Sequence, residues 1–409
     1  MKKIPKLRFK EFVNEWEEKK IENIGKIIGG GTPSSTIEEY WGGDIQWFTP
    51  TEVGKTKYVS KSIRTITELG LNKSSAKLLP KGTILLSSRA TIGEKSISMK
   101  EVCTNQGFQS ILVNKNNNNE FIYYLLDTLK GELVRQSSGS TFLEISGRKL
   151  GNISSAFPNI EEQKKIADFL SAVDVEIDLT NQKLELFEKY KKSIMKKIFN
   201  QELRFKKENG DNYPEWVEKK LEDIGNTYNG LIGKNAEDFG SGKKYITYKN
   251  IFDNTKIDID ILEFVDIKEN EKQNKVEYGD IFFTVSSETP NEVGYTSILL
   301  NNINEDIYLN SFCFGYRIKN KKDFYLEFFR YLLRSHNFRK KIYILAQGST
   351  RFNLSKIEVL KLKVKIPCLE EQQKIADFLS SIDNKIEKLS SKLEELKEFK
   401  KGLLQQMFV

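Results

Sequence analysis

The side chains that most often carry catalysis are sparse in this sequence. Its one histidine, His336, falls in a basic helical stretch, where a solvated surface imidazole is the simplest interpretation. Two Glu-x-Lys triplets, beginning at Glu162 and Glu398, resemble the metal-binding triplet of nucleases, but no Pro-Asp pair precedes either of them. Both triplets also fall in charged helical repeats. We therefore expect no catalytic residues and no metal site in this chain.

Motifs for cofactors, metals and membranes are also missing. The sequence holds no GxxxxGK[ST] loop, and none of its eight prolines is followed by another, which excludes the Asn/Asp-Pro-Pro-aromatic site of amino methyltransferases. Cys103, Cys313 and Cys368 have no CxxC spacing, so neither zinc nor disulfides are expected, and their role stays unassigned. No apolar leader follows Met1 and no run of 18 apolar residues occurs. We expect a cytoplasmic protein with no membrane contact.

The strongest pattern is an internal repeat. The segment EEQKKIADFLS begins at Glu161 and EEQQKIADFLS begins at Glu370, and the two copies stay in register over 158–199 and 367–408. Upstream, EWEEKKIENIG is answered by EWVEKKLEDIG, and GSTFLEIS by GSTRFNLS. Between these anchors the halves hardly resemble each other. The chain therefore consists of two globular segments, each followed by a similar helix.

Both repeated segments predict long helices with a coiled-coil seam. Apolar or long-stemmed residues recur at alternating spacings of four and three, and charged residues fill most other positions. The seam positions are Val173, Ile177, Thr180, Leu184, Phe187, Lys191, Ile194 and Ile198 in the first helix, and Ile382, Ile386, Leu389, Leu393, Leu396, Lys400, Leu403 and Met407 in the second. A helix of some 40 residues is about 60 Å long. Two copies related by a two-fold axis across the helices would pair antiparallel. The alternative is that each helix packs only on its own globular segment.

The globular segments read as α+β domains. Short strand-like runs such as GTILLSS at Gly82 and GDIFFTV at Gly279 alternate with polar turns, and one helical stretch follows them in each half, over 120–136 and 325–342. These patterns favour sheets of mixed or antiparallel strands with long polar loops. The net charge is +8, and the two helical repeats are together nearly neutral, so the excess positive charge lies in the globular segments. Clustered lysine and arginine favour a polyanion as ligand.

Six short sequence phrases, in the order in which they occur, resemble the specificity subunit of type I restriction-modification systems. The phrases are GGGTPSS, YWGGDIQWFTPTEV, LLSSRATIGE, NQGFQSILVN, GSTFLEIS and PNIEEQKKIADFLS. The resemblance covers essentially the whole chain, although the second globular segment departs from the first between Asn226 and Tyr316. It implies two target-recognition domains, at 1–157 and 204–366, with spacer helices at 158–203 and 367–409. The two domains would be separated by the antiparallel coiled coil of these helices, in a pseudo-two-fold repeat.

The resemblance also implies a non-catalytic subunit that reads a bipartite, asymmetric target in double-stranded DNA. It would recruit two modification subunits, which methylate adenine with S-adenosylmethionine, and two restriction subunits, which are motor-nucleases. S-adenosylmethionine, ATP and Mg²⁺ are expected in those partners and no cofactor in this chain. Methylation by a partner requires the target base to leave the duplex, which a clamp on both sides of the site would support.

Candidate DNA contacts are the polar and basic residues of the predicted loops, because such side chains reach phosphates and base edges. In the first domain they are Thr32, Ser34, Ser35, Thr49, Thr51, Arg89, Ser138, Ser140 and Thr141. In the second they are Lys243, Lys244, Tyr248, Lys249, Ser286, Ser287, Thr289, Ser349, Thr350 and Arg351. Arg89 and Arg351 are the strongest candidates, since arginine can bind guanine or phosphate with two hydrogen bonds. For each residue a turn, a cap or a solvated charge is the alternative.

Two other functions fit parts of the pattern. A coiled-coil scaffold with two protein-binding or peptide-binding heads would need no affinity for DNA. A single-chain endonuclease would need a carboxylate cluster for a metal ion, and the sequence offers no obvious one.

Overall fold

The computed structural model describes residues 4–139, 143–348 and 350–409. The chain folds into two compact units. Unit 1 contains residues up to Asn181 together with 391–409, and unit 2 contains residues 182–390. Each unit therefore includes a stretch of each long helix, α6 (Ile160–Phe199) and α12 (Leu369–Met407).

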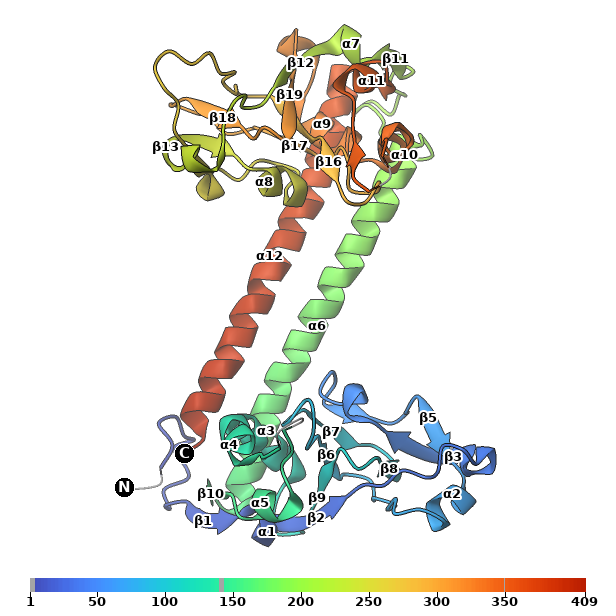
Figure 1. Ribbon diagram of the computed structural model, residues 1–409, viewed down its shortest axis with the longest axis vertical. Helices are drawn as coiled ribbons and strands as arrows, with labels where there is room; N and C mark the ends of the chain where they lie inside the picture. Colours follow the sequence, from blue (N-terminus) through green and yellow to red (C-terminus); the bar gives the residue numbers. More distant parts are fainter. Residues whose placement is uncertain (1–3, 140–142, 349) are drawn as a thin grey trace. The chain divides into compact units, whose positions relative to one another are not determined.

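Unit 1 is built on two sheets of short strands (Figure 1). The larger sheet has the order β2 (Gly25–Gly29), β9 (Gln109–Val113), β6 (Ile84–Leu86), β7 (Lys95–Ser98) and β4 (Tyr58–Val59). The smaller has the order β5 (Arg64–Ile66), β3 (Trp41–Phe48) and β8 (Val102–Thr104). Neighbours are antiparallel except at β4/β7 and β3/β8, which are parallel. A further pair, β1 (Glu17–Lys20) with β10 (Ser154–Phe157), joins the start of the domain to the strand that precedes α6.

Unit 2 repeats this plan with different residues. Its larger sheet has the order β12 (Gly225–Asn229), β19 (Cys313–Ile318), β15 (Ile281–Thr284) and β17 (Thr296–Ile298). Its smaller sheet has the order β14 (Glu263–Val265), β13 (Phe239–Ile246) and β18 (Ile307–Leu309), and β13/β18 is again parallel. β11 (Val217–Lys220) pairs with β21 (Lys363–Ile366), as β1 does with β10. The mixed α+β fold predicted for both globular segments is confirmed.

The helical stretches expected over 120–136 and 325–342 are each two helices, which corrects the prediction of one. α3 (Asn119–Thr128) and α4 (Lys130–Gln136) meet at Leu129, and α9 (Leu326–Leu332) and α10 (His336–Leu345) flank 333–335. The second break has a clear cause, because the Ser335 hydroxyl accepts a hydrogen bond from the Phe338 amide and caps a new helix. The remaining short helices are α1 (Ile21–Ile24), α2 (Glu68–Asn72), α5 (Gly147–Gly151), α7 (Leu221–Ile224), α8 (Tyr248–Asp253) and α11 (Lys356–Leu360).

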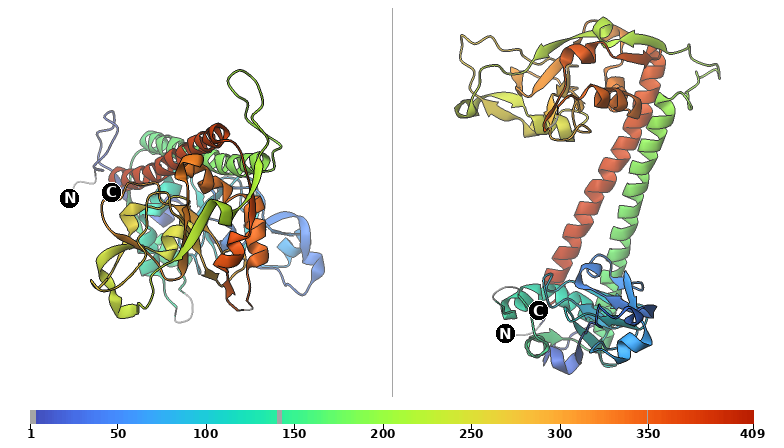
Figure 2. Two further views of the ribbon diagram at one scale, coloured as in Figure 1. Left: turned by 90° about the horizontal axis from the view of Figure 1, so that it is seen from above. Right: turned by 45° about the vertical axis from the view of Figure 1, so that its right-hand side comes forward.

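The two long helices pair antiparallel inside each unit. In unit 1, Lys400 Nζ lies 2.6 Å from an Asp174 carboxylate oxygen, and Lys392 Nζ lies 2.5 Å from Glu176. In unit 2, Lys191 pairs with Asp383. In the internal repeat Lys191 corresponds to Lys400 and Asp383 to Asp174, so the two units form the same ion pair with the roles of the two helices exchanged. Figure 2 shows α6 and α12 side by side at unit 1. Every predicted seam position is buried or half-buried. The alternative prediction, that each helix packs only on its own globular segment, is therefore wrong.

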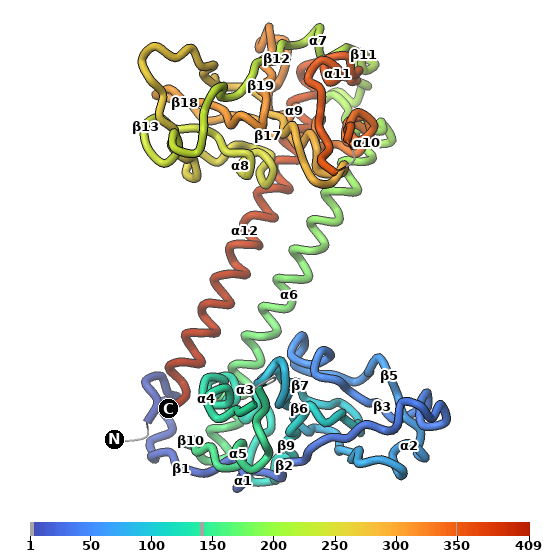
Figure 3. The backbone as a smooth tube through the Cα atoms, viewed as in Figure 1, coloured from blue at the N-terminus to red at the C-terminus, as the bar shows by residue number. Residues whose placement is uncertain are grey.

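The core of each unit includes an aromatic side chain from the far end of a long helix. Phe408 lies 5.2 Å from Phe121 and 6.4 Å from Trp16, centroid to centroid. Phe199 occupies the same place in unit 2, 5.9 Å from Phe328 and 6.3 Å from Trp216. The Leu7 amide also donates to the Gln406 carbonyl at 2.9 Å, and Figure 3 shows the blue start of the described chain beside the red end of α12. Unit 1 is therefore closed by residues from both ends of the described chain.

Because Phe199 repeats Phe408, a fragment of residues 1–200 has a way to complete unit 1. Its α6 lacks the 391–409 partner, and residues 182–199 of a second copy carry the matching seam and the matching aromatic residue. We expect this fragment to sediment as a dimer. Phe199→Asp should make it monomeric, since in the fragment Phe199 has no other core to enter. A folded monomer of the unmutated fragment would contradict the pairing.

Candidate nucleic-acid interface

Loop segments from across the chain form one surface in unit 1. The Gly31 amide donates to the Thr104 carbonyl at 2.9 Å, and the Asn105 amide donates to the Phe48 carbonyl at 3.0 Å. The Ser88 amide donates to the Gly107 carbonyl at 2.8 Å, and the Ile145 amide to the Ser88 carbonyl at 3.1 Å. We call these joined segments loop cluster 1. They are residues 31–36, 48–52, 87–91, 104–107, 138–139 and 143–145.

Unit 2 joins the corresponding segments with the same bonds. The Leu231 amide donates to the Leu309 carbonyl at 2.7 Å and the Asn310 amide to the Ile246 carbonyl at 3.0 Å. The Val285 amide donates to the Phe312 carbonyl at 3.0 Å and the Leu354 amide to the Val285 carbonyl at 2.9 Å. These segments, at 229–234, 246–249, 285–292, 309–312 and 347–354 except residue 349, form loop cluster 2. The shared bonds align Ser88 with Val285, and hence Arg89 with Ser286 and Glu144 with Asn353.

Arg89 and Ser138 are brought together in loop cluster 1. Arg89 NH2 lies 2.7 Å from a Glu144 carboxylate oxygen, and the Arg89 side chain keeps 46% of its surface exposed. The backbones of Ser138 and Glu144 exchange two hydrogen bonds, of 2.9 and 3.0 Å. The Ser138 hydroxyl accepts a bond from Lys149 Nζ at 3.1 Å. Ser140 and Thr141, also predicted here, lie outside the described residues.

The other predicted contacts of unit 1 lie on neighbouring loops of the cluster. The Thr32 hydroxyl donates to the Gln106 side chain at 2.5 Å, and Ser34 bonds Thr36 at 2.9 Å. Thr49 caps a short turn by bonding Glu52, so its hydroxyl has a structural role. Thr51 and Ser35 are exposed, each within one segment of loop cluster 1.

In loop cluster 2 several predicted residues line one hollow. The hollow has a volume of about 460 Å³ and is lined by Tyr248, Phe252, Ser286, Ser287, Glu288, Glu292, Phe312 and Arg351. The Tyr248 hydroxyl donates to the Ser286 carbonyl at 2.8 Å, and the Ser287 hydroxyl donates to Glu292 at 2.9 Å. Strands β16 (Ser286–Ser287) and β20 (Phe352–Asn353) pair at its edge. Arg351 therefore shares a site with Tyr248 and both serines.

Of the remaining predicted residues of unit 2, three lie elsewhere in loop cluster 2 and two lie outside it. Thr350 is exposed next to Arg351, Lys249 is exposed on α8, and the Thr289 amide bonds the Ser287 hydroxyl at 3.3 Å. Lys243 and Lys244 lie further along β13, where Lys244 Nζ pairs with Glu305 at 2.8 Å. Ser349 lies outside the described residues.

Sequence reasoning missed Gln106 and Phe312. Both lie in a turn that begins with an asparagine, whose side-chain oxygen accepts a hydrogen bond from the backbone amide two residues later. The Gly107 amide donates to Asn105 at 2.9 Å, and the Phe312 amide donates to Asn310 at 2.8 Å. Phe312 keeps 60% of its surface exposed at the rim of the hollow. Comparing NQGF with NSFC across the repeat would have identified this shared turn.

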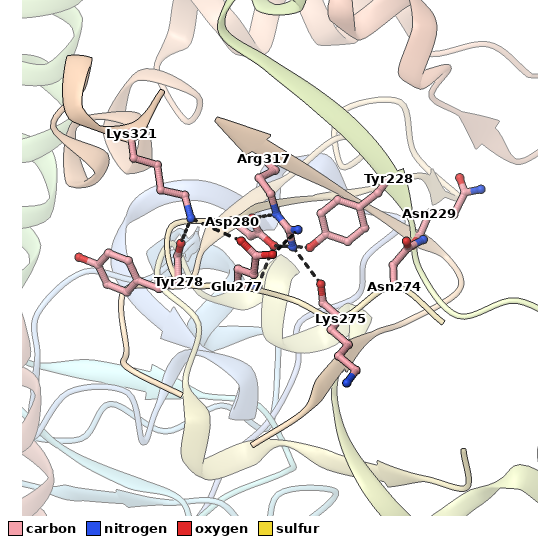
Figure 4. Close-up of polar contacts among 9 residues, drawn as sticks. All are labelled: Tyr228, Asn229, Asn274, Lys275, Glu277, Tyr278, Asp280, Arg317 and Lys321. Carbon is pink, nitrogen blue, oxygen red and sulfur yellow. Dashed lines mark hydrogen bonds and ion pairs between the residues drawn. The ribbon is translucent and has the colours of Figure 1, made fainter. Parts of the chain in front are cut away.

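An ion pair with a buried carboxylate lies in the larger sheet of unit 2 (Figure 4). Asp280 is fully buried and accepts two bonds from Arg317, Nε at 2.8 Å and NH2 at 2.7 Å. The Tyr228 hydroxyl donates to the same carboxylate at 2.6 Å. Burial raises the pKa of Tyr228, so it remains a donor. The strand pairing places Ile28, Thr83 and Leu112 at the matching positions of unit 1, where no charge is buried.

Two arginines hold the loop that leads out of the hollow. Arg339 donates to the carbonyls of Gly294 and Asn291, both at 2.7 Å. Arg334 donates to the carbonyls of Thr296, Ile251, Phe252 and Asn254. The ring of Tyr295 lies 4.4 Å from each guanidinium carbon. Burial lowers the pKa of Arg334 to about 10, so it stays charged at neutral pH.

The side chains that most often carry catalysis or bind metals are dispersed in the described chain. Groups of three or more His, Cys, Asp or Glu side chains able to hold a metal ion are absent among the described residues. His336 is exposed at the first position of α10. Burial raises the pKa of Cys103 to about 12, which makes its thiolate negligible at neutral pH. None of the helices that the structure describes is long and apolar enough to cross a membrane.

Two similar α+β units, each with its own polar loop cluster and a stretch of paired long helices, define a class of internally duplicated α+β proteins. Residues 14–189 and 213–398 match the family described as the type I restriction modification DNA specificity domain, and this chain belongs to that family.

Individual relatives agree with this assignment. The MjaVIII specificity subunit of a type I restriction enzyme from Methanocaldococcus jannaschii is 27% identical over 95% of this chain and 91% of its own. The MjaIX specificity subunit of the same organism is 39% identical, but the match spans about half of each chain. The type I restriction-modification S subunit from M. genitalium has the same fold, with a TM-score of 0.59, 18% identity and 99% of each chain covered.

The Asp280–Arg317 pair gives a stability prediction. Arg317→Leu should lower the free energy of unfolding of unit 2 by about 3–5 kcal/mol, because it leaves the Asp280 carboxylate buried without its partner. Adding Asp280→Thr copies Leu112 and Thr83 of unit 1 and should recover most of the loss. Urea denaturation measures both changes. Equal stability of the single variant and the unmutated chain would contradict the prediction.

Proposed function

We propose that this chain is the DNA-reading subunit of a type I restriction-modification complex. The observation that carries the proposal is that both loop clusters are joined by the same backbone bonds while their side chains differ. Arg89 and Glu144 in cluster 1 correspond to Ser286 and Asn353 in cluster 2. One scaffold that presents two sets of polar side chains fits a protein that reads two different half-sites in one duplex.

In this proposal the chain binds and positions DNA, and its partners do the chemistry. Excess positive charge in the globular segments neutralises phosphates, while loop side chains reach base edges. Two modification subunits supply S-adenosylmethionine and methylate adenine, and two restriction subunits supply ATP- and Mg²⁺-dependent cleavage. The relatives' names as specificity subunits support this division of labour. The site of action is the cytoplasm, where host and invading DNA are encountered.

The target should be asymmetric and interrupted, because the two loop clusters differ and lie in separate units. Mapping methylated adenines in a host with and without this chain tests this directly. With the modification subunits, affinity for that target should fall steeply with salt, by about 0.9 log units per phosphate contact for each tenfold rise in salt. A scaffold with two peptide-binding heads would show no such dependence, and equal binding to all duplexes would refute the proposal.

Arg89 tests the assignment of loop cluster 1. Arg89→Ala should cost about 1–3 kcal/mol at one position of one half-site, if the arginine bonds a guanine, and should leave the other half-site unchanged. Competition binding with single-base target variants measures this. Arg135→Ala is the matched control, because Arg135 is an exposed arginine of unit 1 that pairs with Glu132 on α4. A uniform loss across all sequences would assign Arg89 to phosphate, and no loss would make it structural.

A further inference from the structure

A polar network joins the sheet domain of unit 1 to its long helices. Lys57 Nζ donates to Glu120 at 2.8 Å, to the Tyr124 hydroxyl at 3.0 Å and to the Ser171 hydroxyl at 2.6 Å. Ser171 also donates to Glu120 at 2.8 Å, and Tyr124 donates to Asp174 at 2.5 Å. Lys57 precedes strand β4, the other partners come from α3 and α6, and Asp174 in turn pairs with Lys400 of α12. We call this network joint 1.

Unit 2 has the same network, joint 2. Arg330 lies 3.3 Å from Glu327 and 2.9 Å from Asp383. The Ser380 hydroxyl donates to Glu327 at 2.9 Å, and the Tyr331 hydroxyl donates to Asp383 at 2.8 Å. Four members correspond one to one, because Glu327, Tyr331, Ser380 and Asp383 repeat Glu120, Tyr124, Ser171 and Asp174. Burial raises the pKa of both tyrosines, so both remain donors.

The cation is the member that has changed its place in the chain. The Ile97 amide donates to the Lys57 carbonyl at 2.7 Å, and the Ile298 amide donates to the Thr255 carbonyl at 3.2 Å, so Thr255 occupies the position of Lys57. The helical position of Arg330 is held by Tyr123 in unit 1, as EFIYY and EFFRY show. Arg330 Nε donates to the Thr255 hydroxyl at 2.7 Å. Unit 1 supplies the cation from the sheet domain, and unit 2 supplies it from α9.

Each joint thus contains a buried cation, although the two cations come from different positions in the chain. The side chains of Lys57 and Arg330 are each 11% exposed, and Asp383 is 7% exposed. Asp383 also pairs with Lys191, so Arg330 adds a second positive charge between the carboxylates of Asp383 and Glu327. Two halves that differ in most loop residues still place one positive charge beside the same glutamate and the same tyrosine.

In both units the contacts of Lys57 or Arg330 attach the chain that follows the second segment of the loop cluster to a long helix. Lys57 lies six residues beyond Thr51, and Thr255 lies seven beyond Tyr248. In unit 1 the bond runs to Ser171 on α6, and in unit 2 Arg330 bridges Thr255 to Asp383 on α12. The joint therefore fixes the sheet domain on its own stretch of long helix.

We infer that the two joints are positioning devices that fix how many base pairs separate the two half-sites the complex accepts. The inference rests on the proposed function. A loop cluster that shifts on its helix reaches the same bases at a different distance along the duplex. Loosening a joint therefore widens the tolerated spacing while the bases read within each half-site stay the same. A merely stabilising role would lower activity at all spacings alike.

The test uses the full complex with its modification subunits and duplexes whose half-sites are moved apart or together by one base pair. Lys57→Thr should reduce the methylation preference for the native spacing by up to roughly tenfold, the worth of about one hydrogen bond to a charged group. Lys57→Thr with Tyr123→Arg rebuilds the arrangement of unit 2 and should restore the preference. In unit 2, Arg330→Tyr should loosen the spacing and Arg330→Tyr with Thr255→Lys should restore it.

Milder variants guard against misfolding. Ser171→Ala and its matched partner Ser380→Ala each remove one hydroxyl of a joint and should loosen the spacing in the same direction, with melting temperatures recorded alongside. Unchanged spacing preference in every folded variant, or double variants that restore stability without restoring the preference, would overturn the inference. An unmutated complex that methylates without any sequence preference would instead refute the proposed function.

Discussion

The antiparallel pairing of α6 with α12 inside each unit is the interaction on which the rest of this structure depends. Neither globular segment completes its own core, because each needs an aromatic residue at the far end of a long helix, Phe408 in unit 1 and Phe199 in unit 2. Burying one such side chain contributes about 1.5–3 kcal/mol. The Asp174–Lys400 and Asp383–Lys191 pairs then fix the direction of the helices. Two domains of different sequence are therefore attached to the long helices by the same type of aromatic contact and the same ion pair.

Much of this arrangement could be predicted from the sequence because it repeats. The helices, their seam and their antiparallel pairing followed from a pattern written twice, and the structure confirms them. The role of Glu162 and Glu371 did not follow. Both lie in the first turn of a long helix, yet both side chains are buried and accept hydrogen bonds from Arg8 and Arg204, respectively. The repeated phrase LRFK, at 7–10 and 203–206, marks both arginines, but it does not show which glutamate each arginine reaches.

The loop clusters were the hardest part to predict, for a physical reason. Their frame consists of backbone bonds, such as Ser88 to Gly107 and Val285 to Phe312, which any residue type except proline can donate. Residue identity therefore predicted polar loops but not which loops meet. The hollow beside Arg351 needed Phe252 and Phe312, which had been assigned to no site. Freedom of side-chain choice on a fixed backbone frame is also what lets two different surfaces share one fold.

The interlaced path of the chain has a consequence for its synthesis. Residues 391–409, which complete unit 1, leave the ribosome at least 210 residues after Asn181, the last residue of that unit's first segment. At roughly 5–20 residues per second this is a delay on the order of ten to forty seconds. During that interval the apolar seam of α6 has no partner from its own chain. Adjacent ribosomes on one message carry chains with identical seams. Before residues 391–409 are made, the α6 helices of two nascent chains can therefore pair with each other.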